Sequence, residues 1–471
     1  MIFGNKTVKD IKIAYIGGGS RGWAWGLMSD LAACHDISGE VALYDIDFEA
    51  AKANEIIGNK YNSAEGAKSV WNYKAAKTIG EALTGADFVI ISILPGTFDE
   101  MESDVHAPEK YGIYQSVGDT SGPGGIVRAM RTIPMFEEIA ENIKKYAPDA
   151  WVINYTNPMT LCVKTLYRVF PQIKAFGCCH EVFGTQKFLC SMVEEMLGVK
   201  NVDRSEIKVN PIAVNHFTWL TTATYRNTDM FPYYREFCLA HTDGYKKEDG
   251  PVDDNWFNSF FTSAEKVKID LFNRFGYIAA AGDRHLAEFC PGKWYLESPE
   301  RAKEMRFGLT PVSWRKYNLQ ERLDKSARLQ SGEEAVTISG TGEEGINQIR
   351  ALLGLCDLIT NVNLPNRGQI PNLPLGAVVE TNATFRDGDL QPVFAGPVPE
   401  SIYPLVSKVC AEQEMVSRGI ADRNLSVIFN AFSGDPLVTC GLEDAKKLFK
   451  EMVENTREYL GMYDLSALDN L

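Results

Sequence analysis

A glycine-rich turn between a short apolar strand and a helical segment constrains this chain more than any other feature. Residues 11–16 (IKIAYI) are apolar and rich in β-branched residues, as in a buried parallel strand. Gly17, Gly19 and Gly22 follow in the spacing GxGxxG, and residues 23–34 have helical character. In that context the glycines allow a tight turn and a close approach of the backbone to a pyrophosphate at a helix N-terminus. The turn therefore predicts a dinucleotide-binding βαβ unit.

The acidic residue after the next strand indicates which dinucleotide the turn would bind. Asp45 ends the strand-like segment VALYD, about where a carboxylate would bind the ribose 2′-hydroxyl of NAD. Ser20 lies within the turn and completes the set of expected NAD-binding residues. Arg21 could meet a 2′-phosphate instead, so NADP stays open, and a glycine turn without any nucleotide is the structural alternative.

Strands and helices alternate over the first part of the chain and then the pattern changes. The alternation predicts an α/β fold with a Rossmann-like, doubly wound parallel sheet of the lactate/malate dehydrogenase type over residues 1–200. Residues 201–471 are expected to form a closely joined α+β domain for substrate, metal and oligomerisation. Its expected elements are paired antiparallel strands at 207–225, helices at 253–275, 297–306, 344–358, 403–421 and 442–461, a loop at 361–374 and a strand at 378–385.

Composition excludes several classes of protein. The chain has 471 residues with 48 Lys and Arg against 62 Asp and Glu, a formal charge of -14 that argues against nucleic acid as a partner. No apolar run approaches the roughly 20 residues of a membrane span, and no signal peptide is evident at the start. The ten cysteines include no CxxC pair, so we expect a cytoplasmic protein whose cysteines are mostly buried thiols.

Two polar segments follow expected strands or precede helices, where ligands of open α/β sheets bind. Glycine-dense GDTSGPGG (118–125) carries Asp119 and leads to Arg128 and Arg131, which would otherwise form a solvated helix face. NYTNP contains Asn154 and Asn157, whose amides can bind sugar hydroxyls or simply form a turn before proline.

Three further segments carry cysteine, histidine and acid–base groups. GCCHE contains Cys179 and His180, and VNHFTW contains His216; the alternative for these residues is core packing. GYIAAAGDRHLAEF brings several ionisable side chains together, which invites acid–base chemistry, although a loop with a helix-capping aspartate would look the same. Its candidates are Tyr277, Asp283, Arg284 and His285.

Taken in order, these six segments resemble glycoside hydrolase family 4 from about residue 11 to about residue 435, and they look most like its α-galacturonidase branch. The resemblance implies hydrolysis of α-galacturonides with NAD and Mn²⁺ or another divalent metal. NAD⁺ would oxidise C3, the metal would assist loss of the C2 proton, the C1 substituent would be eliminated, and water addition and re-reduction would complete the cycle.

The resemblance also implies roles for individual residues. Cys179 and His216 would bind the metal, and His180 stands where some members carry an aspartate, so it becomes a candidate proton donor. Tyr277 and Asp283 are the two candidates for the C2 base. The substrate would contact Asn154, Asn157, Asp119 and His285, with Arg128, Arg131 and Arg284 as candidates for a sugar carboxylate.

Other functions remain possible at this stage. Within the family, the chain could be an α-glucosidase, an α-galactosidase or a 6-phosphoglycosidase. Outside it, a lactate/malate-type dehydrogenase or an NAD-binding regulatory protein would share the nucleotide fold. The family implies a homodimer or homotetramer.

Overall fold

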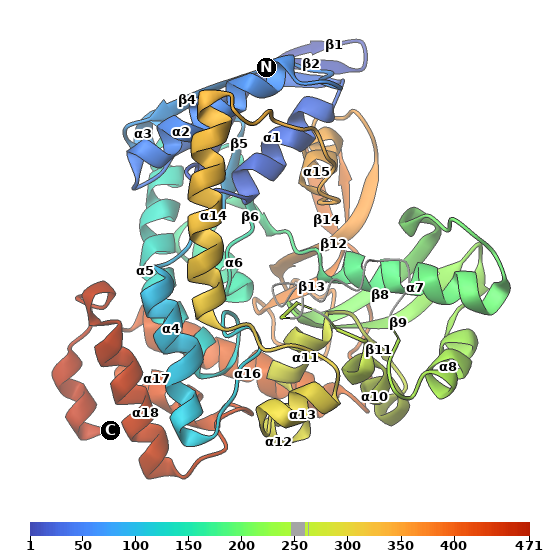
Figure 1. Cartoon of the computed structure of the whole chain (residues 1–471), viewed down its shortest axis with the longest axis vertical. Helices are drawn as coiled ribbons and strands as arrows, with labels where there is room; N and C mark the ends of the chain where they lie inside the picture. Colours follow the sequence, from blue (N-terminus) through green and yellow to red (C-terminus); the bar gives the residue numbers. More distant parts are fainter. Residues whose placement is uncertain (246–259, 262) are drawn as a thin grey trace.

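A parallel sheet forms the N-terminal part of the molecule (Figure 1). The computed structural model describes residues 1–245, 260–261 and 263–471. The neighbouring parallel strands run in the order β4-β3-β2-β5-β6-β7, which in chain order is the 3-2-1-4-5-6 arrangement of a Rossmann-like domain. Their bounds are β2 Thr7–Ile16, β3 Ile37–Tyr44, β4 Trp71–Ala76, β5 Phe88–Ile91, β6 Trp151–Asn154 and β7 Lys174–Gly177. The predicted doubly wound sheet is confirmed.

Helices cover both faces of this sheet because its strands are apolar on both sides. Tyr15 and Ile90 pack towards α1 (Trp23–Ala33) and α2 (Phe48–Lys60), whereas the alternate residues Ile16, Val89 and Ile91 pack towards the opposite face. The second face is covered by α3 (Ile79–Leu83), α5 (Gly122–Tyr146) and α6 (Met159–Val169). The carboxyl ends of β2 and β5, where the strand order reverses, form the switch point at which such sheets bind ligands.

Strands from the second half of the chain extend the same sheet. β12 (Leu358–Pro365) is antiparallel to β7, and β13 (Val378–Arg386) and β14 (Asp389–Pro392) follow it. The prediction of a helix to residue 358 and a loop from 361 was wrong here: α15 (Gly345–Leu352) ends earlier, and 358–365 is a strand. Asn361, which suggested a turn, is buried in β12 and donates its amide to the Glu380 carboxylate at 2.7 Å. The division of the chain at residue 200 stays a prediction.

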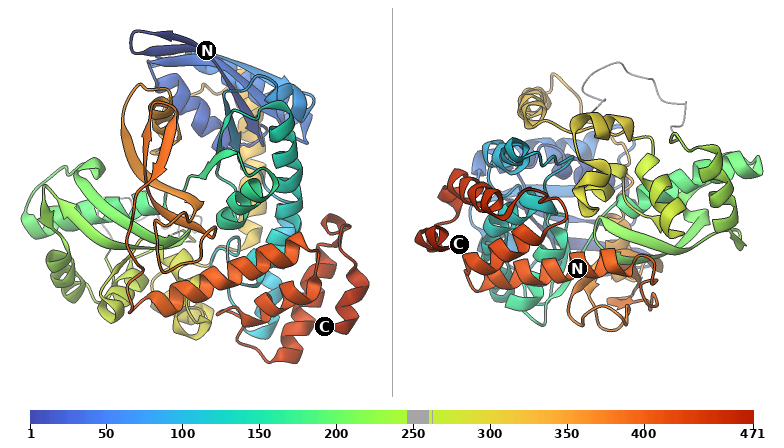
Figure 2. Two further views of the ribbon diagram at one scale, coloured as in Figure 1. Left: turned by 180° about the vertical axis from the view of Figure 1, so that it is seen from behind. Right: turned by 90° about the horizontal axis from the view of Figure 1, so that it is seen from below.

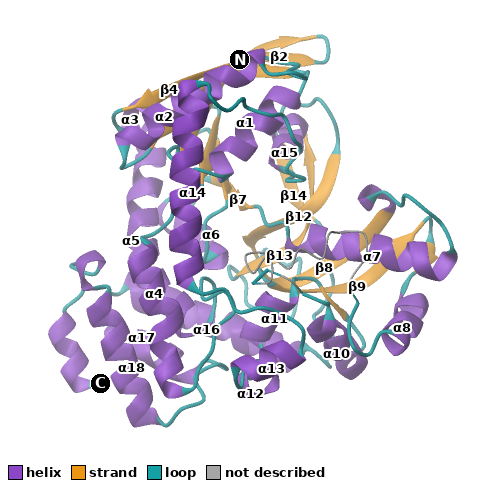
Figure 3. Cartoon of the chain, in the orientation of Figure 1, coloured by secondary structure: helices purple, strands orange, loops and turns teal. Residues whose placement is uncertain are grey.

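A second, antiparallel sheet lies beside the first, and Figure 3 shows its strands β8 (Ile207–Val214) and β9 (Phe217–Tyr225) next to β13. It also contains β10 (Thr228–Asp229) and β11 (Ile278–Ala279), and the pairing of β8 with β9 confirms the expected antiparallel pair. Residues 215 and 216 are the tip of the β8–β9 hairpin. The surrounding helices are α7 (Glu181–Leu197), α8 (Phe231–Ala240), α10 (Lys266–Phe275), α11 (Asp283–Phe289), α12 (Gly292–Tyr295) and α13 (Pro299–Glu304). The first part of the helix predicted at 253–275 lies outside the described residues.

Helix α14 (Val312–Ser331) connects the two ends of the molecule and was absent from the expectations. It packs against α4 (Phe98–His106) and α2, and Figure 1 shows it running from α11 towards β4. The C-terminal helices α16 (Tyr403–Ala421), α17 (Leu425–Gly434) and α18 (Leu442–Asn455) lie at the end opposite the short hairpin of β1 (Ile2–Gly4) with β2, as the left view of Figure 2 shows. Among the described residues, none of the helices is long and apolar enough to cross a membrane.

Candidate active site

The glycine turn after β2 has the geometry that a bound pyrophosphate needs. Gly17 has φ +92°, and a Cβ there would overlap the carbonyl oxygen of Ser92, so only glycine fits. The amide of Gly19 donates to Asp45 at 2.9 Å. Helix α1 starts at Trp23 with neither a side-chain cap nor an acidic residue in its first turn. Its N-terminal amides therefore remain available to an anion, as the dinucleotide prediction requires.

Asp45 is fixed beside this turn at the end of β3. One carboxylate oxygen accepts from Gly19, and the other accepts from the amide of Asp47 at 3.0 Å. Burial raises the pKa of Asp45, although the two amides act in the opposite direction. Arg21, which could bind the 2′-phosphate of NADP, lies 3.9 Å from the carboxylate of Asp47.

A cavity of about 390 Å³ lies next to the start of α1. Trp23 forms part of its wall and is 5.8 Å from the ring of Tyr155, which follows β6. Arg322 of α14, Glu343, Asp30 and Thr341 contribute polar groups to the lining. The glycine turn, the strand ends and this cavity together offer space and polar groups for a dinucleotide.

Three side chains from distant segments converge into a possible metal site. Ligand atoms of Asp119, His216 and His285 all lie within 4.8 Å of one another. Asp119 precedes α5, His216 is at the β8–β9 tip with φ +64°, and His285 belongs to α11. The rings of the two histidines are 3.9 Å apart. One carboxylate and two imidazoles form a donor set that suits a divalent transition metal.

The protonation of this cluster also fits a cation. Burial lowers the pKa of His216 to about 3 and also lowers that of His285, so both imidazoles are neutral at pH 7. Although burial acts to raise it, the pKa of Asp119 is lowered, chiefly by Arg128 and the two histidines. The Nδ1 atom of His285 is buried without a hydrogen-bond partner in the described part of the chain. A carboxylate and two neutral imidazoles, one of which has an unpartnered nitrogen, are groups that metal coordination uses.

Cys179 follows β7 nearby but is not one of the three converging groups. Burial raises the pKa of its thiol well above the ordinary value, and the charges of Glu380 and Glu181 raise it further. Asn361 of β12 donates to the Cys179 carbonyl at 3.3 Å, so the unexpected strand supports this corner. The role of Cys179 as a metal ligand stays a prediction.

Glu181 is a partly buried carboxylate that sequence reasoning missed. It accepts from the amide of Gly282 at 2.6 Å and lies 3.7 Å from His285 and 3.6 Å from His180. His180 is half-exposed, and its Nδ1 is 3.0 Å from the carboxylate of Glu343. The only sequence signal for Glu181 was its place in the GCCHE segment, directly after the strand.

The two candidates for the C2 base lie in different surroundings. Both oxygens of Asp283 accept amides at the start of α10, from Val267 and Lys268, each at 3.1 Å. Burial raises the pKa of Asp283 to about 7. Tyr277 is partly buried with its ring 6.4 Å from that of Phe231. No contact of either side chain with the Asp119 cluster is found among the described residues.

The two asparagines differ in their partners. Asn154 bonds the backbone of Thr156 with both ends of its amide, closing the turn after β6. Asn157 instead donates to Asp119 at 3.4 Å, and its Oδ1 is buried without a partner among the described residues. Asn157 is therefore the asparagine that faces the cluster.

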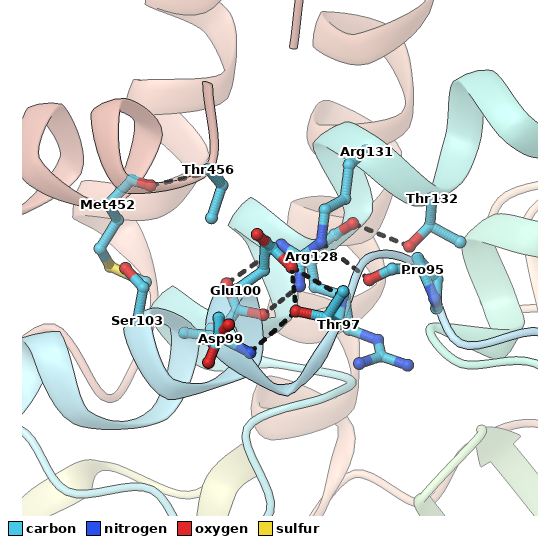
Figure 4. A network of polar contacts seen from close by, with 12 residues as sticks. Pro95, Thr97, Asp99, Glu100, Ser103, Arg128, Arg131, Thr132, Met452 and Thr456 are labelled. Atoms are coloured by element: carbon cyan, nitrogen blue, oxygen red, sulfur yellow. Dashed lines mark hydrogen bonds and ion pairs between the residues drawn. The ribbon is translucent and has the colours of Figure 1, made fainter. Parts of the chain in front are cut away.

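The arginines of α5 are buried, so the solvated-face alternative was wrong. Arg131 forms an ion pair with Asp104 in which both side chains are fully buried, and it donates to the Pro95 carbonyl at 3.0 Å (Figure 4). Arg128 donates to the carbonyl of Asn157 at 3.3 Å and lies near Asp119. Arg131 thus joins α5 to α4, whereas Arg128 faces the cluster.

Comparison with known proteins decides the family. The model of the family 4 glycosyl hydrolases matches residues 12–195, and the model of their C-terminal domain matches residues 213–438. The chain belongs to glycosyl hydrolase family 4. The family predicted from the six segments is confirmed, and the protein is a glycoside hydrolase.

Individual relatives within family 4 are similar over nearly the whole chain. An alpha-galacturonidase of Thermoanaerobacterium saccharolyticum is 59% identical, with 99% of this chain and 100% of the relative covered. A crystal structure described as a glucosidase from Bacillus subtilis has a TM-score of 0.89 at 51% identity, covering 94% of this chain and 100% of that one. The Thermotoga maritima 6-phospho-beta glucosidase, solved with manganese, NAD+ and glucose-6-phosphate, has a TM-score of 0.74 at 21% identity, covering 95% and 99%, and shows the shared fold.

Proposed function

We propose that this family 4 enzyme hydrolyses α-galacturonides and depends on NAD⁺ and a divalent metal, Mn²⁺ in the first place. The observation that carries the substrate is the 59% identity, over 99% of the chain, to a protein named alpha-galacturonidase. The converging Asp119, His216 and His285 support the metal, and the glycine turn beside Asp45 supports the dinucleotide. The finer steps below rest on these same groups.

In this proposal the two bound groups supply the chemistry that amino-acid side chains lack. When bound, NAD⁺ would supply a hydride acceptor and the metal would supply a Lewis acid. The oxidation acidifies the C2 proton, so the C1 substituent can leave by elimination. Because the cofactor would give the hydride back at the end of each cycle, we expect no net oxidation of the substrate.

The protein's own residues then have distinct tasks. Asp119, His216 and His285 would hold the metal through one oxygen and two nitrogens, and the thiolate of Cys179 would complete the set of ligands. Asn157, whose amide lies 3.4 Å from Asp119, is placed to orient a sugar hydroxyl. His180 has Nδ1 on Glu343 and Nε2 3.6 Å from Glu181, and in its protonated form it would donate a proton to the leaving oxygen. Tyr277 and Asp283 both stay candidates for the base at C2.

Three further expectations complete the proposal. All ten cysteines are free thiols, which suits a reducing cytoplasm. We expect the chain to form a homodimer or a homotetramer, and light scattering would measure the molar mass that distinguishes the two. We expect a small sugar as the binding partner, and neither nucleic acid nor a membrane.

The deciding experiment compares 4-nitrophenyl glycosides with NAD⁺, Mn²⁺ and a thiol present. We expect release of nitrophenol from the α-galacturonide, loss of activity with a chelator, and recovery with Mn²⁺. Faster cleavage of an α-glucoside, an α-galactoside or a 6-phosphate would replace the substrate assignment. Accumulation of one NADH for each substrate consumed would instead indicate a dehydrogenase.

A further inference from the structure

Helix α14 carries two arginines on one face, Arg315 and Arg322. They are two helical turns apart, about 10 Å along the axis. The helix runs between the α11 region and the nucleotide-binding half of the molecule (Figure 1). One continuous helix face therefore presents a positive charge near each end of the candidate ligand site.

Arg322 lies at the dinucleotide end. Its Nη1 donates to the carbonyl of Arg21 at 2.9 Å and its Nε to the amide oxygen of Asn318 at 2.8 Å. A Cβ on Gly22 would overlap this guanidinium, which also lines the 390 Å³ cavity. Neither acceptor carries a charge, and no ion pair of Arg322 is found among the described residues, although the carboxylates of Asp30 and Glu343 also line the cavity beside the turn expected to hold a pyrophosphate.

Arg315 lies at the other end, beside Arg284. The ring of Trp314, its neighbour in sequence, packs on Phe261 with centroids 4.7 Å apart, and the Arg284 guanidinium lies 4.9 Å over that same Phe261 ring. Arg315 is half-buried and makes no hydrogen bond or ion pair with any described residue. Burial lowers the pKa of Arg315, while the charge of Asp119 raises it, so Arg315 also lies within electrostatic reach of the cluster.

Arg284 does not neutralise this region either. It donates to the carbonyls of Gly308 at 3.1 Å and Ser116 at 2.5 Å and to the hydroxyl of Thr310, all neutral acceptors. The Arg284 guanidinium lies over the Phe261 ring that Trp314, the neighbour of Arg315 in sequence, also contacts, so the two positive charges lie in the same corner of the molecule. Two partly desolvated cations are stabilised when an anion binds between them.

We propose that Arg315, together with Arg284, receives the carboxylate on C6 of the sugar and is the residue that selects a uronide, while Arg322 binds the dinucleotide pyrophosphate. This inference rests on the proposed function, because it names the group that recognises the galacturonide. Arg131 is not needed for this task, since Asp104 already neutralises it. A planar guanidinium matches a carboxylate in two parallel hydrogen bonds.

The test compares Arg315→Gln, Arg315→Lys and Arg322→Gln with the wild type. Arg315→Gln is expected to lower kcat/KM for 4-nitrophenyl α-galacturonide by about 10- to 100-fold and to weaken binding of free galacturonate similarly. Arg315→Lys should recover part of both losses. Arg322→Gln should raise the Kd of NAD⁺ and leave the Kd of galacturonate within about twofold, and matching melting temperatures would show that the variants fold.

The possible results separate this inference from the function beneath it. Equal galacturonate affinity in Arg315→Gln and the wild type would overturn the role of Arg315, even if the wild type cleaves galacturonides well. A wild type that ignores galacturonides would overturn the proposed function. If such an enzyme cleaves a 6-phosphate and loses this activity in Arg315→Gln, Arg315 binds a phosphate and the selection of a uronide is wrong.

Discussion

The glycine turn and the Asp119 cluster are built in opposite ways. The turn is local: Gly17, Gly19 and Gly22 are neighbours in sequence, and the strand and helix that position them flank them directly. The cluster joins Asp119, before α5, to the tip of a hairpin in another sheet and to α11. A local site depends on backbone conformation at a few glycines, whereas an assembled site depends on the packing of whole elements.

The difference changes what a single substitution does. In the turn, the functional groups are backbone amides, so a side-chain change acts through sterics and shape. In the cluster, the functional groups are side-chain atoms, and removing one removes a ligand while the backbone stays in place. Loss of function should therefore separate from loss of stability in the cluster and accompany it in the turn.

Asp119→Ala should have the largest effect of the changes considered. It removes the only carboxylate of the cluster, and we expect Mn²⁺ affinity and kcat/KM to fall by more than about 100-fold, because even partners of metal ligands are worth roughly 10- to 100-fold. Mn²⁺ should raise the Tm of the wild type but not of the variant. Asp99→Ala, at an exposed position on α4, is the matched control and should bind Mn²⁺ normally. Unchanged Mn²⁺ binding in Asp119→Ala would remove Asp119 from the site.

Gly17→Ala tests the local site. With φ +92° and the Ser92 carbonyl in the way, alanine should cost about 1–3 kcal/mol of folding free energy and weaken NAD⁺ binding at the same time. Gly66→Ala is the control, because Gly66 has φ +88° but open space around it. It should cost about 1 kcal/mol and leave NAD⁺ affinity unchanged. Urea unfolding measures the stability of each variant, and titration measures its NAD⁺ affinity. Equal losses of stability and affinity in Gly17→Ala and Gly66→Ala would mean that the contact with Ser92 is irrelevant.

The local and assembled regions also differ in how far the sequence predicts them. The parallel strands and the turn follow from short-range patterns, because a buried strand, a glycine turn and a helix are contiguous in the chain. Strand β12 does not, since Asn361 and Asn363 suggest a loop until their amide groups are known to donate to Glu380 of β13 and to the sulfur of Met159 in α6. Helix α14 is mainly polar and buries only Val312, Ser326 and Leu329, so it has no clear apolar stripe.

The Asp119 cluster shows most clearly what cannot be predicted from the sequence. Asp119, His216 and His285 were each candidates, but only His216 was expected to bind metal. Nothing in their spacing brings them together, because the convergence depends on how the β8–β9 hairpin and α11 pack against the segment before α5. Residue types are visible in a sequence, whereas proximity between distant segments is a property of tertiary packing.

Asp45→Ala should have a moderate effect confined to the local site. Gly19 loses the acceptor of its amide, and we expect the Kd of NAD⁺ to rise about tenfold, as for the loss of one charged hydrogen bond. The preference for NADP⁺ over NAD⁺ should rise, because Arg21 then faces less negative charge. Asp47→Ala removes the cap of α2 instead and should cost about 1 kcal/mol of stability with little change in NAD⁺ affinity. If both variants bind NAD⁺ equally well, Asp45 has no part in cofactor binding.

The smallest expected effect is the number of protons released when Mn²⁺ binds. This number decides whether Cys179 is one of the metal ligands of the assembled site. At pH 7 Asp119 is already ionised and His216 and His285 are already neutral, so these three should bind Mn²⁺ without releasing a proton. Burial raises the pKa of the Cys179 thiol, so ligation by Cys179 requires the loss of about one proton, as for any thiol that becomes a metal ligand.

Calorimetric titration of Mn²⁺ in two buffers of different ionisation enthalpy measures this proton release. We expect a release near one in the wild type and in Cys178→Ser, a matched control at the neighbouring buried thiol. In Cys179→Ser the release should fall to near zero with weaker binding. A release near zero in the wild type would restrict the site to the three groups that already converge, since a buried thiol that keeps its proton is a poor ligand for a cation.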